Sequence, residues 1–283
     1  MAKYVAFIDI LGFKDRISKI SHAEAEEFIR SLGRMIYRAW GNAGLNDNQR
    51  IKGYFISDSI IVNTEDSTGQ TLKTLVDFLL SLYKRAFSEH SILLRGAIAK
   101  GDFSLIPSYG FDNLEKGLLV GEAYIKAYTM ESTKKGSFIL FDSIVKEDIE
   151  HLEQDEYIID SIDGNDMFTL QWANIDFLLQ PNHLDKFVDM GCRSNWLPHY
   201  YQTLYLFIVN CGNARRKKQV FDTIIESIRR TRADYWRAMD KFISNAFSND
   251  VSPRFQMIFL NYLREHIDIQ NVAQIPLGLV AGD

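Results

Sequence analysis

The sequence predicts an α+β fold with a mainly helical C-terminal extension, and two observations predict it. Apolar runs rich in β-branched and aromatic residues alternate with amphipathic stretches through about the first 145 of the 283 residues. From about residue 175 the strand signal fades, and residues 214–247 have a mostly helical pattern with one charged face. We therefore expect one domain at 1–145 and a mixed, then mainly helical region at 146–283.

The first predicted elements are a buried strand and a long helix. The apolar run Tyr4–Ile10 consists largely of residues that favour strands. The capping box Ser21–Glu24 then opens an amphipathic helix that extends to about Trp40, before a loop rich in Gly and Asn. The apolar stripe of this helix predicts that one of its faces packs on the sheet.

A hairpin, a second helix and a further strand follow in the first half of the chain. Lys52–Ile56 and Ile60–Asn63 predict a hairpin with its turn at Ser57–Ser59, a leucine seam predicts a helix at Thr71–Phe87, and Ile92–Lys100 predicts a strand. This order is that of a ferredoxin-like core, in which helices cover one face of the sheet. We expect a further helix and a further strand at Glu122–Ser132 and Ser137–Phe141.

The composition is typical of a soluble globular protein. Hydrophobic residues make up 46% and charged residues 24% of the chain, and no apolar run approaches the ~18 residues that a membrane span needs. Asp9 within the first apolar run does not fit a secretory signal, and the two cysteines, Cys192 and Cys211, favour a reducing compartment over a disulfide framework. We expect a cytoplasmic protein without a membrane segment.

Basic residues gather in the predicted C-terminal helices, at Arg215–Lys218 and at Arg229–Arg232. They could form a nucleic-acid surface or a solvated helix face. The net charge of −5 and the lack of aromatic residues among these cations favour the solvated face. We therefore expect no nucleic-acid partner.

Several catalytic motifs are missing from the sequence. It contains no Gly-x-x-x-x-Gly-Lys-Ser/Thr phosphate loop, no Gly-x-Gly-x-x-Gly motif and no Gly-x-Ser-x-Gly elbow. Its six histidines show no metal-binding spacing with one another or with cysteine. Any bound metal would therefore be a hard cation, Mg²⁺ or Mn²⁺, held by carboxylates.

Two aspartates stand at the ends of apolar strands. Asp9 ends the first strand, shortly before Gly12, and Asp58 lies at the tip of the predicted hairpin. Because the first strand of a ferredoxin-like sheet lies beside this hairpin, the two carboxylates can meet and hold two divalent ions. Gly12 would let the backbone approach a triphosphate closely. The alternative for either aspartate alone is an ordinary turn residue.

Four segments of the sequence resemble motifs of the class III nucleotidyl cyclases. Phe7–Phe13 and Ile56–Ser59 resemble the two metal-binding motifs, Leu94–Gly101 resembles the strand that follows, and Val120–Glu131 resembles the dimer-interface helix. The resemblance covers about residues 3–145. It implies a catalytic domain at 1–145, two Mn²⁺ or Mg²⁺ ions in each site, and a homodimer with composite sites.

The resemblance also implies roles for single residues. Asp9, Asp58 and the backbone carbonyl of Ile10 would bind the metal ions, and the amides of Gly12 and Phe13 would lie under the phosphates. In this family the ribose 3′-hydroxyl attacks the α-phosphorus, which releases pyrophosphate and closes a 3′,5′-cyclic nucleotide.

One departure from the family concerns the recognition of the base. Adenylate cyclases have a lysine four residues before the second metal aspartate, where this sequence has Tyr54. A tyrosine there is similar to the pyrimidine cyclases of the Pycsar antiphage systems, which implies conversion of UTP, or of CTP, to cyclic UMP or cyclic CMP as a signal for a downstream effector. The residues themselves leave the choice between uridylate and cytidylate open. The alternative for Tyr54 is a core tyrosine of the strand.

A second departure concerns charge stabilisation. Ile125 and Thr129 stand where many class III cyclases have an asparagine that orients the ribose and an arginine that stabilises the transition state. Neither side chain replaces a guanidinium. Arg95, Lys100 and Lys126 are the candidates to supply the charge, and Arg95 is favoured because it lies on a core strand. The competing hypothesis is a catalytically inactive, cyclase-like dimer that senses nucleotides or acts as a scaffold.

Overall fold

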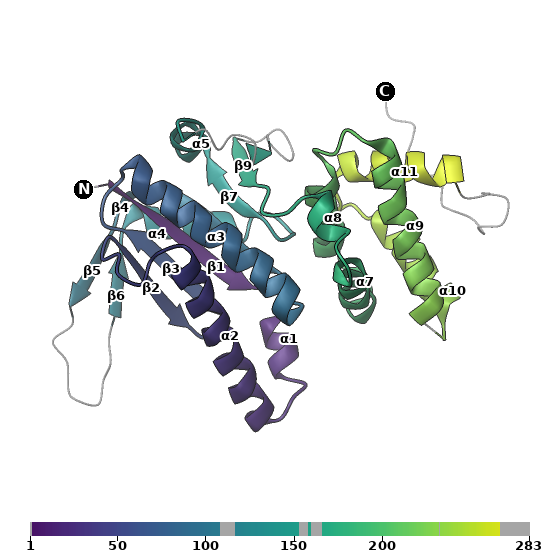
Figure 1. Cartoon of the computed structure of the whole chain (residues 1–283), viewed down its shortest axis with the longest axis horizontal. Coiled ribbons are helices and arrows are strands. Elements are labelled where there is room, and N and C mark those ends of the chain that lie inside the picture. Colours follow the sequence, from purple (N-terminus) through teal and green to yellow (C-terminus); the bar gives the residue numbers. More distant parts are fainter. Residues whose placement is uncertain (1, 108–116, 153–157, 160–165, 232, 267–283) are drawn as a thin grey trace. The chain divides into compact units, whose positions relative to one another are not determined.

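The chain forms two units, residues 1–173 and 174–283, and each is considered by itself (Figure 1). The computed structural model describes residues 2–107, 117–152, 158–159, 166–231 and 233–266. The first unit ends later than the domain boundary expected at residue 145, because strands after that residue still pair into its sheet.

The first unit is a mixed sheet with helices on both faces. In chain order its described elements are β1 (Ala2–Ile10), α1 (Phe13–Ile17), α2 (His22–Asn42), β2 (Ile51–Ile56), β3 (Ser59–Thr64), α3 (Gly69–His90), β4 (Leu94–Asp102), β5 (Ser104–Pro107), β6 (Gly117–Val120), α4 (Glu122–Glu131), β7 (Ile139–Asp142), α5 (Ser143–Glu150), β8 (Ile158–Ile159) and β9 (Met167–Leu170). The large sheet has the strand order β2-β3-β1-β4-β7-β9-β8, and β5 pairs with β6 separately. The order β2-β3-β1-β4, with α2 and α3 as connections, confirms the predicted ferredoxin-like α+β core.

Side-chain contacts show which helices cover which face of this core. A Cβ atom on Gly96 of β4 would lie 2.9 Å from the hydroxyl of Tyr83 on α3, so α3 covers that face, on the same side as α2 (Figure 1). Phe7 of β1 points the other way, and its ring meets the ring of Tyr128 on α4 edge-on, with centroids 5.1 Å apart. Because alternate residues of a strand share a face, Asp9 lies on the α4 face with Phe7.

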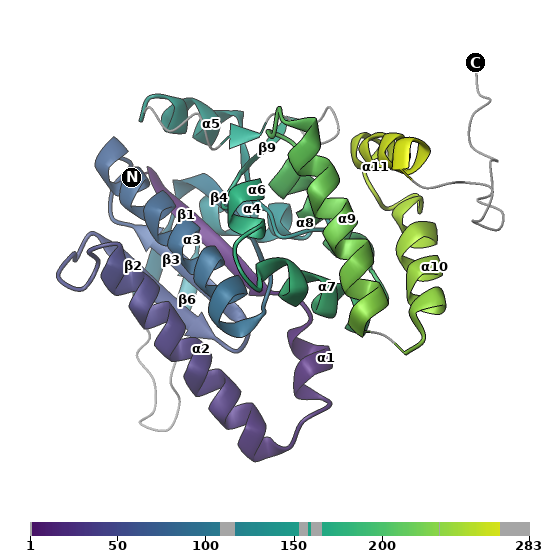
Figure 2. The same cartoon turned by 45° about the vertical axis from the view of Figure 1, so that its right-hand side comes forward.

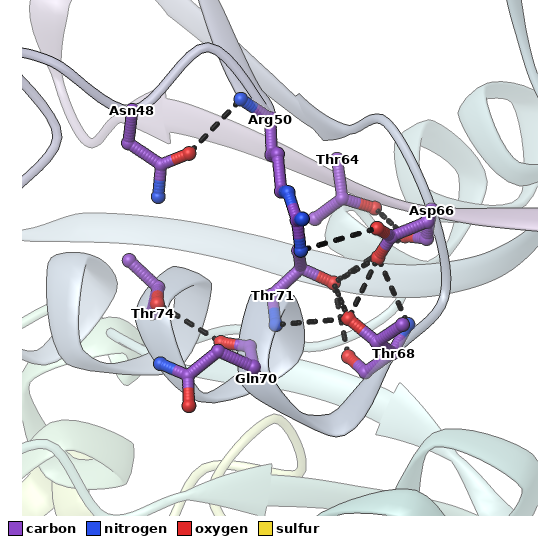
Figure 3. Close-up of polar contacts among 8 residues, drawn as sticks. All are labelled: Asn48, Arg50, Thr64, Asp66, Thr68, Gln70, Thr71 and Thr74. Carbon is purple, nitrogen blue, oxygen red and sulfur yellow. Dashed lines mark hydrogen bonds and ion pairs between the residues drawn. The ribbon is translucent and has the colours of Figure 1, made fainter.

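Local hydrogen bonds fix the starts of the two long helices. The predicted capping box of Ser21 and Glu24 is formed at the start of α2. At α3, Thr68 is the N-cap, and Oδ1 of Asp66 accepts from the Thr68 amide at 3.0 Å and from the hydroxyls of Thr68 and Thr71 at 2.8 Å each (Figure 3). These bonds hold the pKa of Asp66 below its usual value. The contacts among Asp66, Thr68 and Thr71 in Figure 3 therefore form a helix cap.

The start of α4 depends on a glycine at the end of β6. Gly121 has a φ of 150°, and a Cβ atom there would lie 2.2 Å from the carbonyl oxygen of Asp102. A side chain at this position has no room, so only glycine lets α4 begin directly against the end of β4. The buried face of α4 consists of Ala123, Ala127, Met130 and Glu131.

The described elements of the second unit are all helices, as expected for the C-terminal part. Its helices are α6 (Ile175–Leu178), α7 (His183–Arg193), α8 (Pro198–Ile208), α9 (Ala214–Thr231), α10 (Tyr235–Ala246) and α11 (Pro253–His266). Helix α8 is the central element and contacts α6, α10 and α11, whereas α9 packs on α7 and α10 (Figure 2). No described helix combines the length and the apolar character that crossing a bilayer requires.

Three basic residues of α9 form ion pairs with carboxylates of the same unit. Ion pairs join them as Arg216–Asp176, Lys218–Asp222 and Arg230–Asp185. Such pairs on exposed side chains are typical of a solvated helix face, the interpretation that the sequence favours. Arg232 lies outside the described residues.

Candidate active site

The sheet register brings Asp9 and Asp58 to the same end of two neighbouring strands. Asp9, near the end of β1, stands between Ser59 of β3 and Arg95 of β4. Asp58 immediately precedes Ser59 in the tight turn between β2 and β3, in which Ser57 has a left-handed φ of 58°. The hairpin turn therefore places the second aspartate beside the strand end that holds the first.

The two aspartates lie close enough for their charges to interact. Burial raises the pKa of Asp9, and the negative charge of Asp58 raises it further. Arg95 opposes both effects, because its Nε and Nη2 donate hydrogen bonds to Oδ2 of Asp9 at 3.1 and 2.9 Å. The site thus combines two mutually repelling carboxylates with one guanidinium, and only 17% of the Asp9 side chain is exposed.

Arg95 has a second carboxylate partner, Glu131, which the sequence analysis did not single out. Glu131 is the last residue of α4, is 3% exposed and forms an ion pair with Nε of Arg95. Burial raises the pKa of its carboxyl group to about 7, although Arg95 acts in the opposite direction. A signal was present in the sequence, since Ala123, Ala127 and Glu131 are spaced by four and therefore share one helix face. A carboxylate in line with two alanines is a candidate for burial.

The raised pKa of Glu131 predicts a pH dependence of stability. Because its pKa of about 7 exceeds the ordinary value of 4.5, the folded state binds this proton more tightly than the unfolded state. Glu131 therefore favours folding at acidic pH, and this contribution is lost as the pH rises through 7. Between about pH 5 and pH 8 we expect the free energy of unfolding of the wild type to fall, relative to that of Glu131→Gln, by on the order of 2 kcal/mol. Urea unfolding of both proteins at several pH values measures this difference, and parallel pH profiles would contradict the prediction.

Tyr54 lies on the same face of the sheet as Asp9. It pairs in register with Ile61 of β3, which in turn pairs with Phe7 of β1. Residues opposite each other in register point to the same face. Tyr54 therefore lies on the face of Phe7 and Asp9, level with Phe7, which is two residues before Asp9 on β1. The side chain of Tyr54 is half-buried, and its hydroxyl has no hydrogen-bond partner among the described residues.

The backbone turns directly after the Asp9–Ile10 end of β1. Gly12 has a left-handed φ of 74°, and α1 begins at Phe13. The ring of Phe13 lies against the ring of Phe28 on α2, with centroids 6.3 Å apart. This contact anchors the Gly12–Phe13 segment next to the strand end that bears the aspartates.

Of the three cations proposed from the sequence, Arg95 contacts Asp9, whereas the two lysines pair with other carboxylates. Lys100 donates to Asp148 at 2.7 Å and lies over the ring of Tyr4, on the face opposite Asp9. Lys126 forms an ion pair with Asp142 at the end of β7. Ile125 and Thr129, which the sequence resemblance aligns with an asparagine and an arginine of class III cyclases, are both exposed on α4.

The donor groups at the strand ends suit a divalent cation completed by other ligands. Among the described residues, no group of three or more His, Cys, Asp and Glu side chains is arranged to hold a metal ion. Asp9 and Asp58 supply two carboxylates, and a cation between them would relieve their mutual repulsion, which adds to the effect of burial on the pKa of Asp9. Two carboxylates with a backbone carbonyl, water and substrate phosphates form a common ligand set for Mg²⁺. The residues present therefore fit a hard divalent ion.

Comparison with solved structures finds similar folds among nucleotide cyclases. The adenylyl cyclase CyaB from P. aeruginosa matches at 14% identity over 60% of this chain and 93% of its own, with a TM-score of 0.46. The guanylate cyclase domain of RhGC from Catenaria anguillulae, in complex with GTP, matches at 18% identity over 60% and 95%, with a TM-score of 0.46. A dimeric guanylyl cyclase domain of the RhoGC fusion protein from Blastocladiella emersonii matches at 19% identity over 60% and 92%, with a TM-score of 0.48. The likeness is one of fold. No protein-family model and no curated protein matches the sequence.

Proposed function

We propose that this chain is a nucleotide cyclase that converts UTP, or CTP, into 3′,5′-cyclic UMP, or cyclic CMP, and pyrophosphate. The proposal rests on the convergence of Asp9 and Asp58 at neighbouring strand ends, beside the guanidinium of Arg95. The motifs that resemble class III cyclases support the reaction, and Tyr54 in the second metal motif supports a pyrimidine substrate. As in the Pycsar systems, the product would serve as a second messenger in antiphage defence, recognised by a downstream effector.

In the proposed reaction the protein orients the triphosphate and neutralises its charge. Asp9, Asp58 and the carbonyl of Ile10 would hold two Mn²⁺ or Mg²⁺ ions, which when bound polarise the phosphate and lower the pKa of the attacking hydroxyl. Arg95 and the amides of Gly12 and Phe13 would face the phosphate oxygens. The O3′–Pα bond forms while the bridging bond from Pα to the β-phosphate oxygen breaks, so that pyrophosphate leaves and the 3′-hydroxyl proton passes to water.

The exposed side of α4 supports assembly of a homodimer. Ile125 and Tyr128 of α4 are 63% and 56% exposed, and Val120, at the end of β6 just before the helix, is 49% exposed, although all three are large and apolar. Clustered exposed apolar residues mark interaction surfaces. A two-fold dimer through α4 would pair this surface with its own copy, and each site would then be completed by the partner subunit.

One experiment tests the reaction and the substrate together. The purified protein is incubated with ATP, GTP, CTP and UTP in the presence of Mn²⁺, and the cyclic products are identified by mass spectrometry. Cyclic UMP or cyclic CMP as the main product supports the proposal. Cyclic AMP or cyclic GMP as the main product would support cyclase activity but contradict the pyrimidine assignment. The absence of any cyclic product would contradict both.

Tyr54 provides a test of base selection. If its hydroxyl bonds the pyrimidine edge, Tyr54→Phe removes one hydrogen bond, worth about 0.5–1.5 kcal/mol, and slows pyrimidine turnover roughly two- to tenfold. Tyr54→Ala also removes the bulk that excludes purines, so it is expected to narrow the preference over ATP and GTP. Nucleotide competition and melting temperatures of both variants measure these effects. A core tyrosine would give a silent Tyr54→Phe, and a Tyr54→Ala that loses stability and all activities together.

The alternative of an inactive nucleotide-sensing dimer has one observation in its favour. Ile125 and Thr129 replace the asparagine and arginine of the family, and neither supplies a charge to the site. Such a protein would bind nucleoside triphosphates in the presence of Mn²⁺ and form no pyrophosphate. Equilibrium binding combined with a pyrophosphate assay separates this alternative from the cyclase.

A further inference from the structure

We propose that Glu131 is a positioning residue that draws Arg95 away from Asp9 and so lets a divalent cation bind there. The proposal rests on the proposed function in that it takes Asp9 as a metal ligand. It adds a role for a buried carboxylate at the end of α4 and an order of events at the site. Arg95 is the internal counter-ion of Asp9 before the metal binds, and Glu131 receives the guanidinium when the metal takes its place.

The geometry is that of one guanidinium shared between two carboxylates. Nε and Nη2 of Arg95 donate to Oδ2 of Asp9 at 3.1 and 2.9 Å, and Oε1 of Glu131, which accepts no hydrogen bond from the described residues, is in ion-pair contact with Nε. The side chains of Asp9 and Glu131 are only 17% and 4% exposed. Such poorly solvated carboxylates depend on protein partners for their charge, so either one left alone would be costly.

Arg95 and a metal ion compete for Asp9. Both are cations, and both require the Asp9 carboxylate, whose Oδ2 already accepts two hydrogen bonds from Arg95. Two cations on one carboxylate repel each other, most strongly in a poorly solvated site. Binding of a metal at Asp9 therefore weakens or breaks the contact between Arg95 and Asp9.

Glu131 lowers the free-energy cost of this exchange. Its carboxylate already contacts Nε of Arg95, so the guanidinium keeps a charged partner after it leaves Asp9. If Glu131 is made neutral, Asp9 becomes the sole anionic partner that these contacts give Arg95, and the metal ion has to displace a stronger ion pair.

The test measures Mn²⁺ affinity without nucleotide, by the electron paramagnetic resonance signal of free Mn²⁺, at pH 8 under nitrogen. We expect Glu131→Gln to weaken Mn²⁺ binding about fivefold or more, and Arg95→Met to strengthen it by a similar factor. In the Arg95→Met background, adding Glu131→Gln should have no further effect, because Glu131 acts through Arg95. The matched control is Asp148→Asn, which neutralises the carboxylate partner of Lys100, a residue of β4 like Arg95. This variant should leave Mn²⁺ affinity unchanged.

The outcomes separate this inference from the proposed function. If Asp9→Asn leaves Mn²⁺ affinity unchanged, the metal site and the inference are both wrong. If Asp9→Asn abolishes binding while Glu131→Gln lowers only the melting temperature, Glu131 is merely structural and the inference alone is overturned. Should Glu131→Gln fail to fold, Arg95→Met decides, because an unchanged or weaker Mn²⁺ affinity in that variant overturns the competition.

Discussion

Replacing Asp9 or Asp58 with asparagine is expected to reduce cyclic nucleotide formation by roughly a hundredfold or more, while the sheet remains folded. A neutral amide is a much weaker ligand for a hard cation than a carboxylate, so each change removes one of the two charges that would hold the ions. Asp58→Asn is the cleaner variant, because Asp58 occupies a tight turn, where asparagine is equally well tolerated. Product formation and thermal unfolding of each variant measure the two parts of this expectation.

The matched control for these variants is Asp47→Asn, which makes the same chemical change at an exposed loop residue of the same unit. It should leave product formation and stability unchanged. Full activity in either Asp9→Asn or Asp58→Asn would contradict the two-metal interpretation. A loss of activity that tracks a loss of folding would assign the aspartates a structural role.

Charged residues at the exposed apolar positions of α4 are expected to dissociate the proposed dimer and to abolish activity together. Ile125→Glu and Tyr128→Glu place a carboxylate on the exposed apolar surface of α4, and in a two-fold dimer each change meets its own copy across the interface. Like charges at the centre of an interface cost several kcal/mol. Light scattering should then report a mass near the 32.7 kDa of one chain in place of twice that value.

The control is Tyr37→Glu on α2, because Tyr37 is 69% exposed and belongs to a helix of the opposite sheet face. This variant should remain dimeric and active. A wild-type protein that is monomeric, with a specific activity independent of its concentration, would contradict the composite site. So would a Tyr128→Glu variant that is monomeric and fully active.

The core of the first unit could be predicted because its elements have local signals. The capping box at Ser21 and Glu24 places the start of α2, and the two apolar runs on either side of Ser57–Asp58 give the β2–β3 hairpin. The short strands β8 and β9 span two and four residues and are held by pairing with distant segments. No local pattern of that length separates a strand from a loop, so the extension of the sheet beyond β7 was not predictable.

The site was predictable only as far as the sheet topology sets it. Once β1 lies beside the hairpin, Asp9 and Asp58 have to approach each other, and Arg95 has to face Asp9 across the β1–β4 ladder. The contact between Arg95 and Glu131 depends on how α4 packs against β4, which no sequence periodicity specifies. The face of Lys100, by contrast, follows from strand alternation, which places it opposite Asp9, and its pairing with Asp148 occurs on that face.

The geometry of the site depends on Gly121, a residue that has no functional group. A side chain at Gly121 would collide with the backbone at Asp102, and α4 would have to move away from β4 as a whole. Glu131 and the exposed apolar surface would move with it. The geometry of the site therefore depends on a backbone position as well as on side chains, because α4 can bring Glu131 to Arg95 only while that position remains glycine.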